Sequence, residues 1–262
     1  MGRKKILLTN DDGIESPGIN KLVEELISIA DLTVVAPDRQ KSATSHSLTI
    51  DGILPIKEVS MPCGFKGFAV VNGTPTDCVL IAIKDIMKED LPDLLISGIN
   101  QGANLGGDIL YSGTVAAALE GLTQGITSFA VSLDSLSSNS HFETAAKAMV
   151  KIVETEEFYK NLLQEKSILN INVPNVPYEE LKGFTITRQG DLSYQNYVEK
   201  YISPKNKAYY WIGGDRPPHE IDEETDSFAI AYKKISISPI NVDLTNYRLL
   251  PRLKKIIAAL KL

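Results

Sequence analysis

The sequence predicts an α/β protein in which a mostly parallel sheet lies between two layers of helices. Short apolar segments alternate with amphipathic segments over the first two thirds of the chain, and the first strand, helix and strand fit within about 30 residues. Units of this kind build parallel sheets with right-handed crossovers. With 262 residues, 43% of them hydrophobic, the chain can bury a substantial core. We therefore expect a three-layer, Rossmann-like sandwich.

The first strand and the loop after it carry the strongest signal. The apolar run 6–8 follows basic residues and predicts a buried strand, and the polar loop that follows contains the adjacent carboxylates Asp11 and Asp12. Like charges this close predict either a bound cation or a strongly perturbed pKa. The alternative is a turn in which the two acids only cap the next helix.

The remaining elements of this core follow from periodicity. The segment 18–29 repeats apolar residues at helical spacing, and the run 32–36 is a strand that Pro37 ends. Residues 51–59 are poorly patterned and contain a strand or two at most. Thr74 or Thr76 should cap the helix that follows the turn at 72–77. We expect further strands at 68–71, 91–97, 129–133 and 168–174, and further helices at 76–87, 115–122 and 144–153.

Two further loops follow strands of the predicted parallel sheet, so they should reach the same edge as Asp11 and Asp12. Residues 37–47 are rich in hydroxyl groups and charge, although a solvated connector would also have this composition. Five glycines lie between Ser97 and Thr114, and small hydroxyl residues stand directly before a strong helix-forming segment. Such a helix start can bind phosphate through its free N–H groups, although Ser112 or Thr114 could simply cap the helix.

These three loops together predict a metal-dependent hydrolase of phosphate esters. Oxygen ligands without cysteine or clustered histidine favour Mg²⁺ or Mn²⁺, and such a cation can polarise a phosphoryl oxygen and activate water.

The character of the sequence changes near residues 173–177. We expect a Rossmann-like catalytic core over 1–175 and a C-terminal extension over 176–262, with a projecting antiparallel hairpin, further strands and a terminal helix over 247–262. The aromatic surface of the hairpin and the apolar stripe of the helix predict a homodimer or homotetramer. The alternative is an arm that folds back on its own sheet. The aromatic residues are Phe184, Tyr194, Tyr197, Tyr201, Tyr209, Tyr210 and Trp211.

The ordered motifs of the first half resemble the SurE survival-protein family of nucleotidases. The second half matches only in general character. The motifs are Thr9-Asn10-Asp11-Asp12-Gly13, Pro17-Gly18-Ile19, Ala36-Pro37-Asp38-Arg39 with Ser42 and Ser45, Gly73-Thr74-Pro75-Thr76-Asp77, Ser97-Gly98-Ile99-Asn100 and Tyr111-Ser112-Gly113-Thr114-Val115-Ala116-Ala117.

The resemblance implies hydrolysis of nucleoside monophosphates with one divalent cation per subunit, Mg²⁺ or Mn²⁺. It leaves open the 5′ or 3′ ester, the preferred base and action on polyphosphate. Family members are often acidic at the position of Gly107 and vary at that of His46, which bears on substrate preference rather than on metal binding. The implied metal ligands are Asp11, Asp12, Ser42 and Asn100, the two acids being catalytic, and the implied substrate contacts are Asn10, Ser45, Asn104, Ser112, Gly113 and Thr114.

Composition excludes several other classes of protein. The formal charge of −6 and the absence of a basic run argue against a nucleic-acid duplex as partner. No apolar run approaches the ~18 residues of a membrane span, and the three apolar residues after the basic start are too few for a signal peptide. We expect a cytoplasmic protein in which Cys63 and Cys78 are free thiols.

Two rival functions use similar residues. A phospho-acceptor receiver domain also places paired acids after its first strand, but it needs an Asp after its third strand, where this chain has Asn72. A non-catalytic nucleotide-binding protein would use the same loops without turnover, and only an assay of phosphate release separates it from an enzyme.

Overall fold

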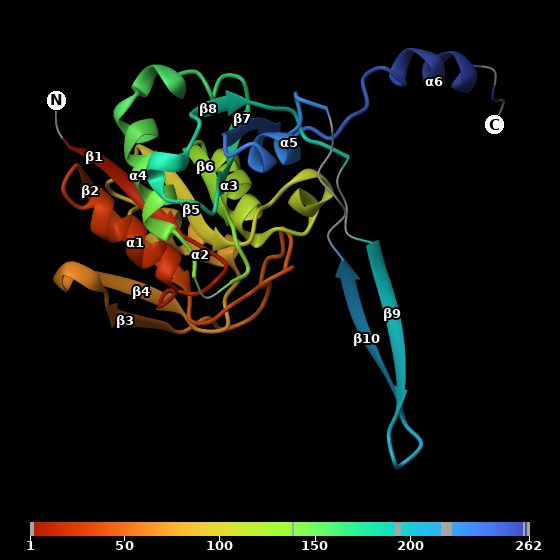
Figure 1. Cartoon of the computed structure of the whole chain (residues 1–262), viewed down its shortest axis with the longest axis horizontal. Coiled ribbons are helices and arrows are strands. Elements are labelled where there is room, and N and C mark those ends of the chain that lie inside the picture. The colour runs from red at the N-terminus through yellow and green to blue at the C-terminus, as the bar shows by residue number, and fades with distance from the viewer. Residues whose placement is uncertain (1–2, 138, 192–194, 216–221, 259, 261–262) are drawn as a thin grey trace.

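The computed structural model describes residues 3–137, 139–191, 195–215, 222–258 and 260. A nine-stranded sheet runs through the main body in the order β3-β4-β2-β1-β5-β6-β7-β11-β8 (Figure 1). Its neighbouring strands are parallel except at β3–β4 and β7–β11, which confirms the predicted mostly parallel sheet. The strands are β1 Lys4–Thr9, β2 Ala30–Pro37, β3 Ile56–Ser60, β4 Lys66–Val70, β5 Leu94–Gln101, β6 Thr127–Asp134, β7 Ser167–Pro174, β8 Phe184–Ile186 and β11 Ile235–Asn241.

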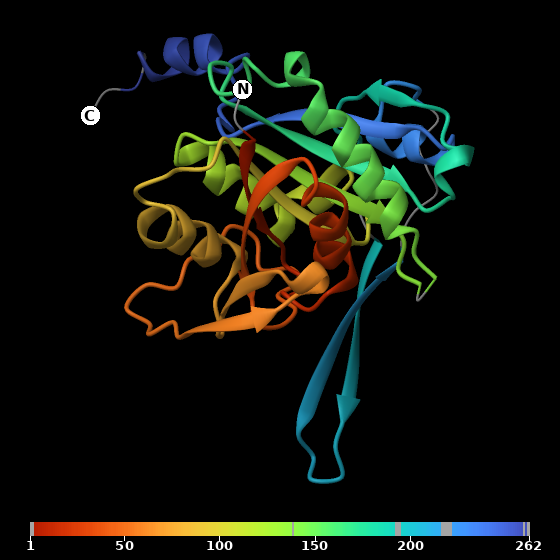
Figure 2. The same ribbon diagram turned by 90° about the vertical axis from the view of Figure 1, so that its left-hand side faces the viewer.

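Helices cover both faces of this sheet, which confirms the predicted three layers (Figures 1 and 2). Helices α1 (Pro17–Leu26) and α4 (Phe142–Glu154) pack together on one face, and α2 (Pro75–Ile81) packs beside α3 (Gly113–Thr123) on the other. Because side chains alternate along a strand, Ile6 and Leu8 of β1 enter the core under α1 and α4. Leu7 enters the core under α2.

The observed elements differ from the predicted ones at three places. The helix expected over 76–87 ends as α2 at Ile81 and continues as a wider turn over 82–86. The terminal helix α6 is shorter than expected, Leu250–Ile257. Helix α5 (Asp226–Ala231) was not predicted, because six residues are too few to show a helical period; it packs against β7 and β11.

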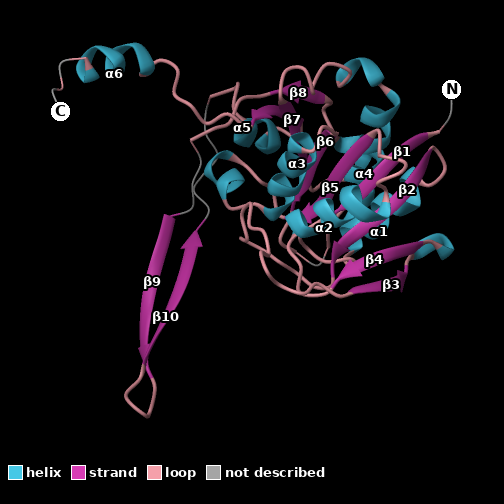
Figure 3. Ribbon diagram, turned by 180° about the vertical axis from the view of Figure 1, so that it is seen from behind, coloured by secondary structure: helices cyan, strands magenta, loops and turns pink. Residues whose placement is uncertain are grey.

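The C-terminal part of the chain contributes to the main sheet and also leaves it. Strands β8 and β11 extend the sheet beyond β7, whereas β9 (Gln195–Ile202) and β10 (Ala208–Asp215) form a separate antiparallel hairpin. Phe184, predicted to belong to the aromatic arm, lies in β8 of the main sheet instead, and Tyr194 lies outside the described residues. This hairpin projects from the body, and α6 lies at the end of an extended segment (Figure 3). The domain boundary at residue 175 stays a prediction. In the part of the chain that the structure describes, no helix is long and apolar enough to cross a membrane.

Candidate active site

A cleft of about 580 Å³ lies where the chain order of the sheet reverses, with β2 on one side of β1 and β5 on the other. In open α/β sheets, ligands bind outside the carboxyl ends of the strands at such a reversal. The loop after β1, the loop after β2 and the loop after β5 all reach the cleft. They bring together five of the predicted site residues as lining, namely Asp11, Ser42, Asn100, Asn104 and Ser112.

Asp11 is held almost completely out of water at the bottom of this cleft, with 4% of its surface exposed. The hydroxyl of Thr114 donates to its Oδ1 at 2.5 Å, and the N–H of Lys41 donates to its backbone carbonyl at 2.7 Å. A Cβ at Gly113 would lie 2.9 Å from the Cβ of Asp11, so only glycine lets the start of α3 approach this closely. Burial raises the pKa of Asp11, while the hydrogen bond from Thr114 acts in the opposite direction.

Asp12 has a different environment, although it adjoins Asp11. Its Oδ2 accepts a hydrogen bond from the backbone N–H of Gln101 at 2.8 Å, which ties the loop after β1 to the end of β5. Burial, together with the negative charge of Asp11, raises the pKa of Asp12 to about 6. The pKa values of both acids are thus raised, which is one of the two alternatives, a bound cation or a perturbed pKa, that the sequence predicted.

Asn100 reaches the cleft through an irregularity in the sheet. The register between β5 and β6 shifts between Ser97 and Asn100, which changes the direction of the strand end. The Asn100 amide nitrogen donates to the carbonyl of Gly102 at 2.7 Å. That bond fixes the orientation of the amide, so its oxygen can serve as a neutral ligand for a cation.

Asn104 rests on a buried polar network that the sequence analysis missed. Its side chain donates to Ser132 at 2.7 Å, its backbone N–H donates to Asn172 Oδ1 at 2.8 Å, and its carbonyl accepts from both Asn170 and Asn172. Asn170 and Asn172 are fully buried on β7, for which the sequence predicted only a strand over residues 168–174. Two asparagines at alternate positions of a predicted buried strand could have indicated this network, because buried amides need hydrogen-bond partners.

Ser112 and Thr114 are engaged within the protein at the start of α3. Ser112 is the N-cap residue, whose hydroxyl accepts from the N–H of Val115 at 3.0 Å, and the Thr114 hydroxyl is bonded to Asp11. The capping alternative is thus observed at Ser112, and the phosphate role of the helix start stays a prediction.

Four of the six predicted substrate contacts do not line the cleft, namely Asn10, Ser45, Gly113 and Thr114, and neither does the predicted metal ligand Asp12. The Asn10 amide donates to the carbonyl of Gly13 and to the hydroxyl of Ser16, so it braces its own loop. The Ser45 hydroxyl donates to the carbonyl of Leu110 at 2.8 Å and lies at the edge of a second cavity. Their roles in substrate binding stay predictions.

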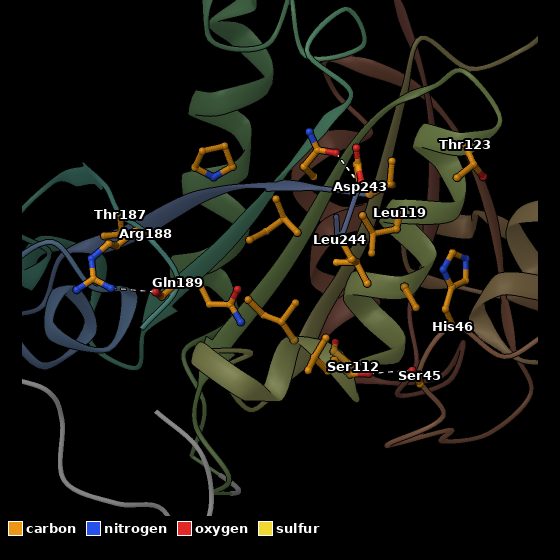
Figure 4. Close-up of a pocket in the computed structure, with 17 residues that line it drawn as sticks. Ser45, His46, Ser112, Leu119, Thr123, Thr187, Arg188, Gln189, Asp243 and Leu244 are labelled. Atoms are coloured by element: carbon orange, nitrogen blue, oxygen red, sulfur yellow. Dashed lines mark hydrogen bonds between the residues drawn. The ribbon is translucent and has the colours of Figure 1, made fainter. Parts of the chain in front are cut away.

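The second cavity, of about 730 Å³, is larger and lies beside the cleft, with which it shares Leu110 and Ser112. Figure 4 shows Ser45 and His46 on the opposite side of it from Arg188 and Gln189. His46 lies 2.9 Å from the Glu120 carboxylate, and this contact lowers the pKa of Glu120. We place the candidate chemistry in the smaller cleft, because Asp11, Ser42, Asn100 and Asn104 line that cleft and not the larger cavity.

The donors at the cleft fit a hard cation. Among the described residues, no three His, Cys, Asp or Glu side chains cluster as a metal site, so a cation here would depend on two carboxylates supplemented by neutral oxygens. The adjacent acids carry charge that their burial disfavours, and a divalent cation is the group that would compensate it. Ser42 and Asn100 supply further oxygen atoms of the type that Mg²⁺ and Mn²⁺ accept.

The fold and the cleft together define a Rossmann-like α/β protein with an acidic cleft at the reversal of its sheet. Comparison with known proteins agrees, since the family model "Survival protein SurE" matches residues 6–196. The chain belongs to this family, as the motifs of its first half predicted.

Relatives named 5′-nucleotidase SurE match nearly the whole chain. The 5′-nucleotidase SurE of Nitrosomonas europaea is 46% identical over 93% of this chain and 95% of its own length. The 5′-nucleotidase SurE of Syntrophomonas wolfei is 43% identical over 96% of this chain and 94% of its own length. The crystal structure of the SurE protein from Aquifex aeolicus has a TM-score of 0.80 and 43% identity, and the match covers 97% of this chain and 99% of that one.

Proposed function

We propose that this chain is a metal-dependent 5′-nucleotidase that hydrolyses nucleoside monophosphates to nucleoside and phosphate. The observation that carries the proposal is the convergence of Asp11, Ser42, Asn100, Asn104 and Ser112 on one cleft from loops far apart in the sequence. The names of the relatives support the same activity, and SurE-family 5′-nucleotidases are generally metal-dependent phosphatases.

The residues divide into two groups in this proposal. Asp11, Asp12, Ser42 and Asn100 hold one Mg²⁺ or Mn²⁺, which when bound supplies polarisation of the phosphoryl group and activation of water. Asn104 and the start of α3 hold the phosphate, and their fixed hydrogen-bond donors favour the charge that develops during transfer to water. Thr114 keeps Asp11 in place through its hydrogen bond.

The assay that tests the proposal is phosphate release from AMP, with and without EDTA and with Mg²⁺ or Mn²⁺ restored. We expect release that EDTA abolishes, and we expect Asp11→Asn and Asp12→Asn each to lower kcat/KM by about 100-fold or more, since each removes a charge that holds the cation. Asp90→Asn, a matched change at an exposed acid that pairs with Lys5, should leave the rate unchanged.

Binding of AMP without phosphate release at any metal concentration would favour the non-catalytic nucleotide-binding protein. Full activity of both aspartate variants at saturating Mn²⁺ would reject the metal assignment.

The proposal also includes assembly and location. The hairpin β9–β10 and helix α6 expose large apolar side chains and lie apart from the main body, which supports a homodimer or homotetramer in which they pack on another chain (Figure 1). The cytoplasmic location expected from the sequence remains a prediction.

A further inference from the structure

The mouth of the cleft is apolar, in contrast to its floor. Three large hydrophobic side chains line the cleft and are also strongly exposed: Leu110 is 61% exposed, Tyr111 64% and Leu136 79%. Leu110 and Tyr111 precede α3, whereas Leu136 comes from the loop after β6. A single exposed apolar side chain needs no explanation. Three large apolar side chains beside one polar cleft indicate a surface that a ligand covers.

The backbone that carries Tyr111 is fixed on both sides. Its N–H donates to the carbonyl of Asp108 at 3.0 Å, and its own carbonyl accepts from the N–H of Ser45 at 3.0 Å. Tyr111 also directly precedes Ser112, the N-cap residue of α3. An exposed ring on a fixed backbone loses little conformational entropy on binding, which suits it to contact a flat ligand group.

Leu136 is also carried on a braced loop. The amide of Gln101 donates to the carbonyl of Ser137 at 2.9 Å, and the hydroxyl of Ser135 lies 3.1 Å from that of Ser137. A Cβ at Gly102 would lie 3.1 Å from Leu136 Cδ2, so Leu136 lies directly over this glycine of the cleft. Two loops thus present apolar side chains beside the groups that would hold phosphate.

We propose that Tyr111 and Leu136 form a nucleobase subsite at the mouth of the cleft, with the base stacked on the tyrosine ring and packed against the leucine. The inference rests on the proposed function, because it places the base of the same nucleotide whose phosphate lies on the polar floor. Every base has a π-face, so stacking of this kind recognises an aromatic base while tolerating its identity.

The test separates the base from the phosphate by using two phosphate monoesters, AMP and glycerol 2-phosphate, which has no base. Tyr111→Ala should lower kcat/KM for AMP by about 5- to 140-fold, mainly through KM, because base stacking contributes about 1–3 kcal/mol. The same variant should leave glycerol 2-phosphate hydrolysis within about twofold of the native protein. Leu136→Ala should change the two substrates in the same way by a smaller factor.

A binding measurement gives a second readout that needs no turnover. Calorimetry with adenosine, which lacks phosphate, should detect binding to the native chain and to Tyr111→Phe, which keeps the ring, but weaker binding to Tyr111→Ala. Phe158→Ala removes an exposed aromatic ring outside both cavities and serves as the matched control. Its binding of adenosine should equal that of the native chain.

Three results would overturn the subsite. An equal loss on AMP and glycerol 2-phosphate would show that Tyr111 acts on the phosphate end, and an unchanged KM for AMP would place the base elsewhere. A change of oligomeric state in Tyr111→Ala, seen by light scattering, would assign the ring to a contact between chains. Failure of the native chain to hydrolyse either ester would instead reject the proposed function, and adenosine binding would still test the subsite.

Discussion

Asp11 and Asp12 are neighbours with the same side chain, but their carboxylates have different hydrogen-bond partners. Asp11 receives the Thr114 hydroxyl, whereas Asp12 receives one backbone N–H and faces the charge of Asp11. Asp12 is therefore protonated below about pH 6 when no cation is bound, and this proton competes with a cation for the carboxylate. The stability of the fold is linked to this proton.

Asp12→Asn should make the metal-free protein more stable at pH 7.5. The pKa of Asp12 is about 6 in the folded chain, against 3.8 for an unperturbed aspartate side chain, so folding favours the protonated form. This contribution is fully present below pH 3.8 and is lost as the pH rises through 6, a difference of about 3 kcal/mol. Urea unfolding in EDTA should show Asp12→Asn more stable than the native protein by up to that amount at pH 7.5, with the gap closing toward pH 4. A gap that does not change with pH would contradict this linkage.

Asn100 and Asn104 are a matched pair, since both are amides that line the cleft. Asn100→Ala removes an oxygen proposed for the cation, so activity should fall about tenfold or more and recover in part at high Mn²⁺. Asn104→Ala removes a proposed phosphate contact, so KM should rise and added metal should not restore it. Steady-state kinetics across a Mn²⁺ titration distinguishes the two, and equal recovery of both variants would reject the division of roles.

Thr114 is not suitable as the phosphate-side member of such a pair. We expected its hydroxyl to face phosphate, but in the structure it donates to Asp11. A Thr114→Val change would therefore disturb the proposed metal side of the site as well as the helix start. A motif can show that a hydroxyl stands at this position, but not which of its neighbours it bonds.

At the scale of elements, the start of α2 is connected to the loop that carries Ser42. Thr74 caps the helix and forms a reciprocal capping box with Asp77, which confirms one of the two caps that the sequence offered. Asp77 also accepts from the N–H and the hydroxyl of Thr49, at 2.9 and 2.7 Å. One buried carboxylate thereby fixes both a helix end and the end of the loop after β2.

Asp77→Ala should lower the free energy of unfolding by about 2–3 kcal/mol, because it removes the capping box and leaves the donors of Thr49 and Thr74 without their acceptor. Asp85→Ala, at an exposed acid in the turn after α2, should change it by less than about 0.5 kcal/mol. Urea unfolding at pH 7.5 measures both. A similar loss in the two variants would show that the contacts of Asp77 contribute little.

Sequence periodicity identified most of the central sheet because buried parallel strands are apolar and their helices are amphipathic. The strand Leu94–Gln101 and the helix Phe142–Glu154 are examples. The helix α5 was not predicted because its six residues are too few to show a helical repeat of apolar side chains. The support of Asn104 by Asn170 and Asn172 escaped for a related reason, since contacts between residues more than 60 positions apart leave no local pattern.

At the scale of the whole molecule, the two segments that leave the main body both expose several large apolar side chains. Tyr210 and Trp211 of the hairpin are each 64% exposed, and the apolar stripe of α6 faces solvent. A stable contact between two proteins buries about 800 Å² on each partner. Exposed aromatic and aliphatic side chains on projecting elements suit such a contact, because a neighbouring chain can cover them without altering the central sheet.

We therefore predict that the intact chain is a homodimer or homotetramer at micromolar concentration. Deleting residues 247–262 should expose the apolar surface that α6 covers on the neighbouring chain. The protein should then shift toward monomer or aggregate in light scattering. Leu253→Ser with Ile256→Ser changes only the stripe and should weaken assembly in the same direction, whereas Lys254→Ser with Lys255→Ser, on the same helix, should leave it intact. Because these changes lie outside the cleft, AMP hydrolysis per chain would also show whether assembly and activity are coupled. A monodisperse monomer of the intact chain would reject the assembly.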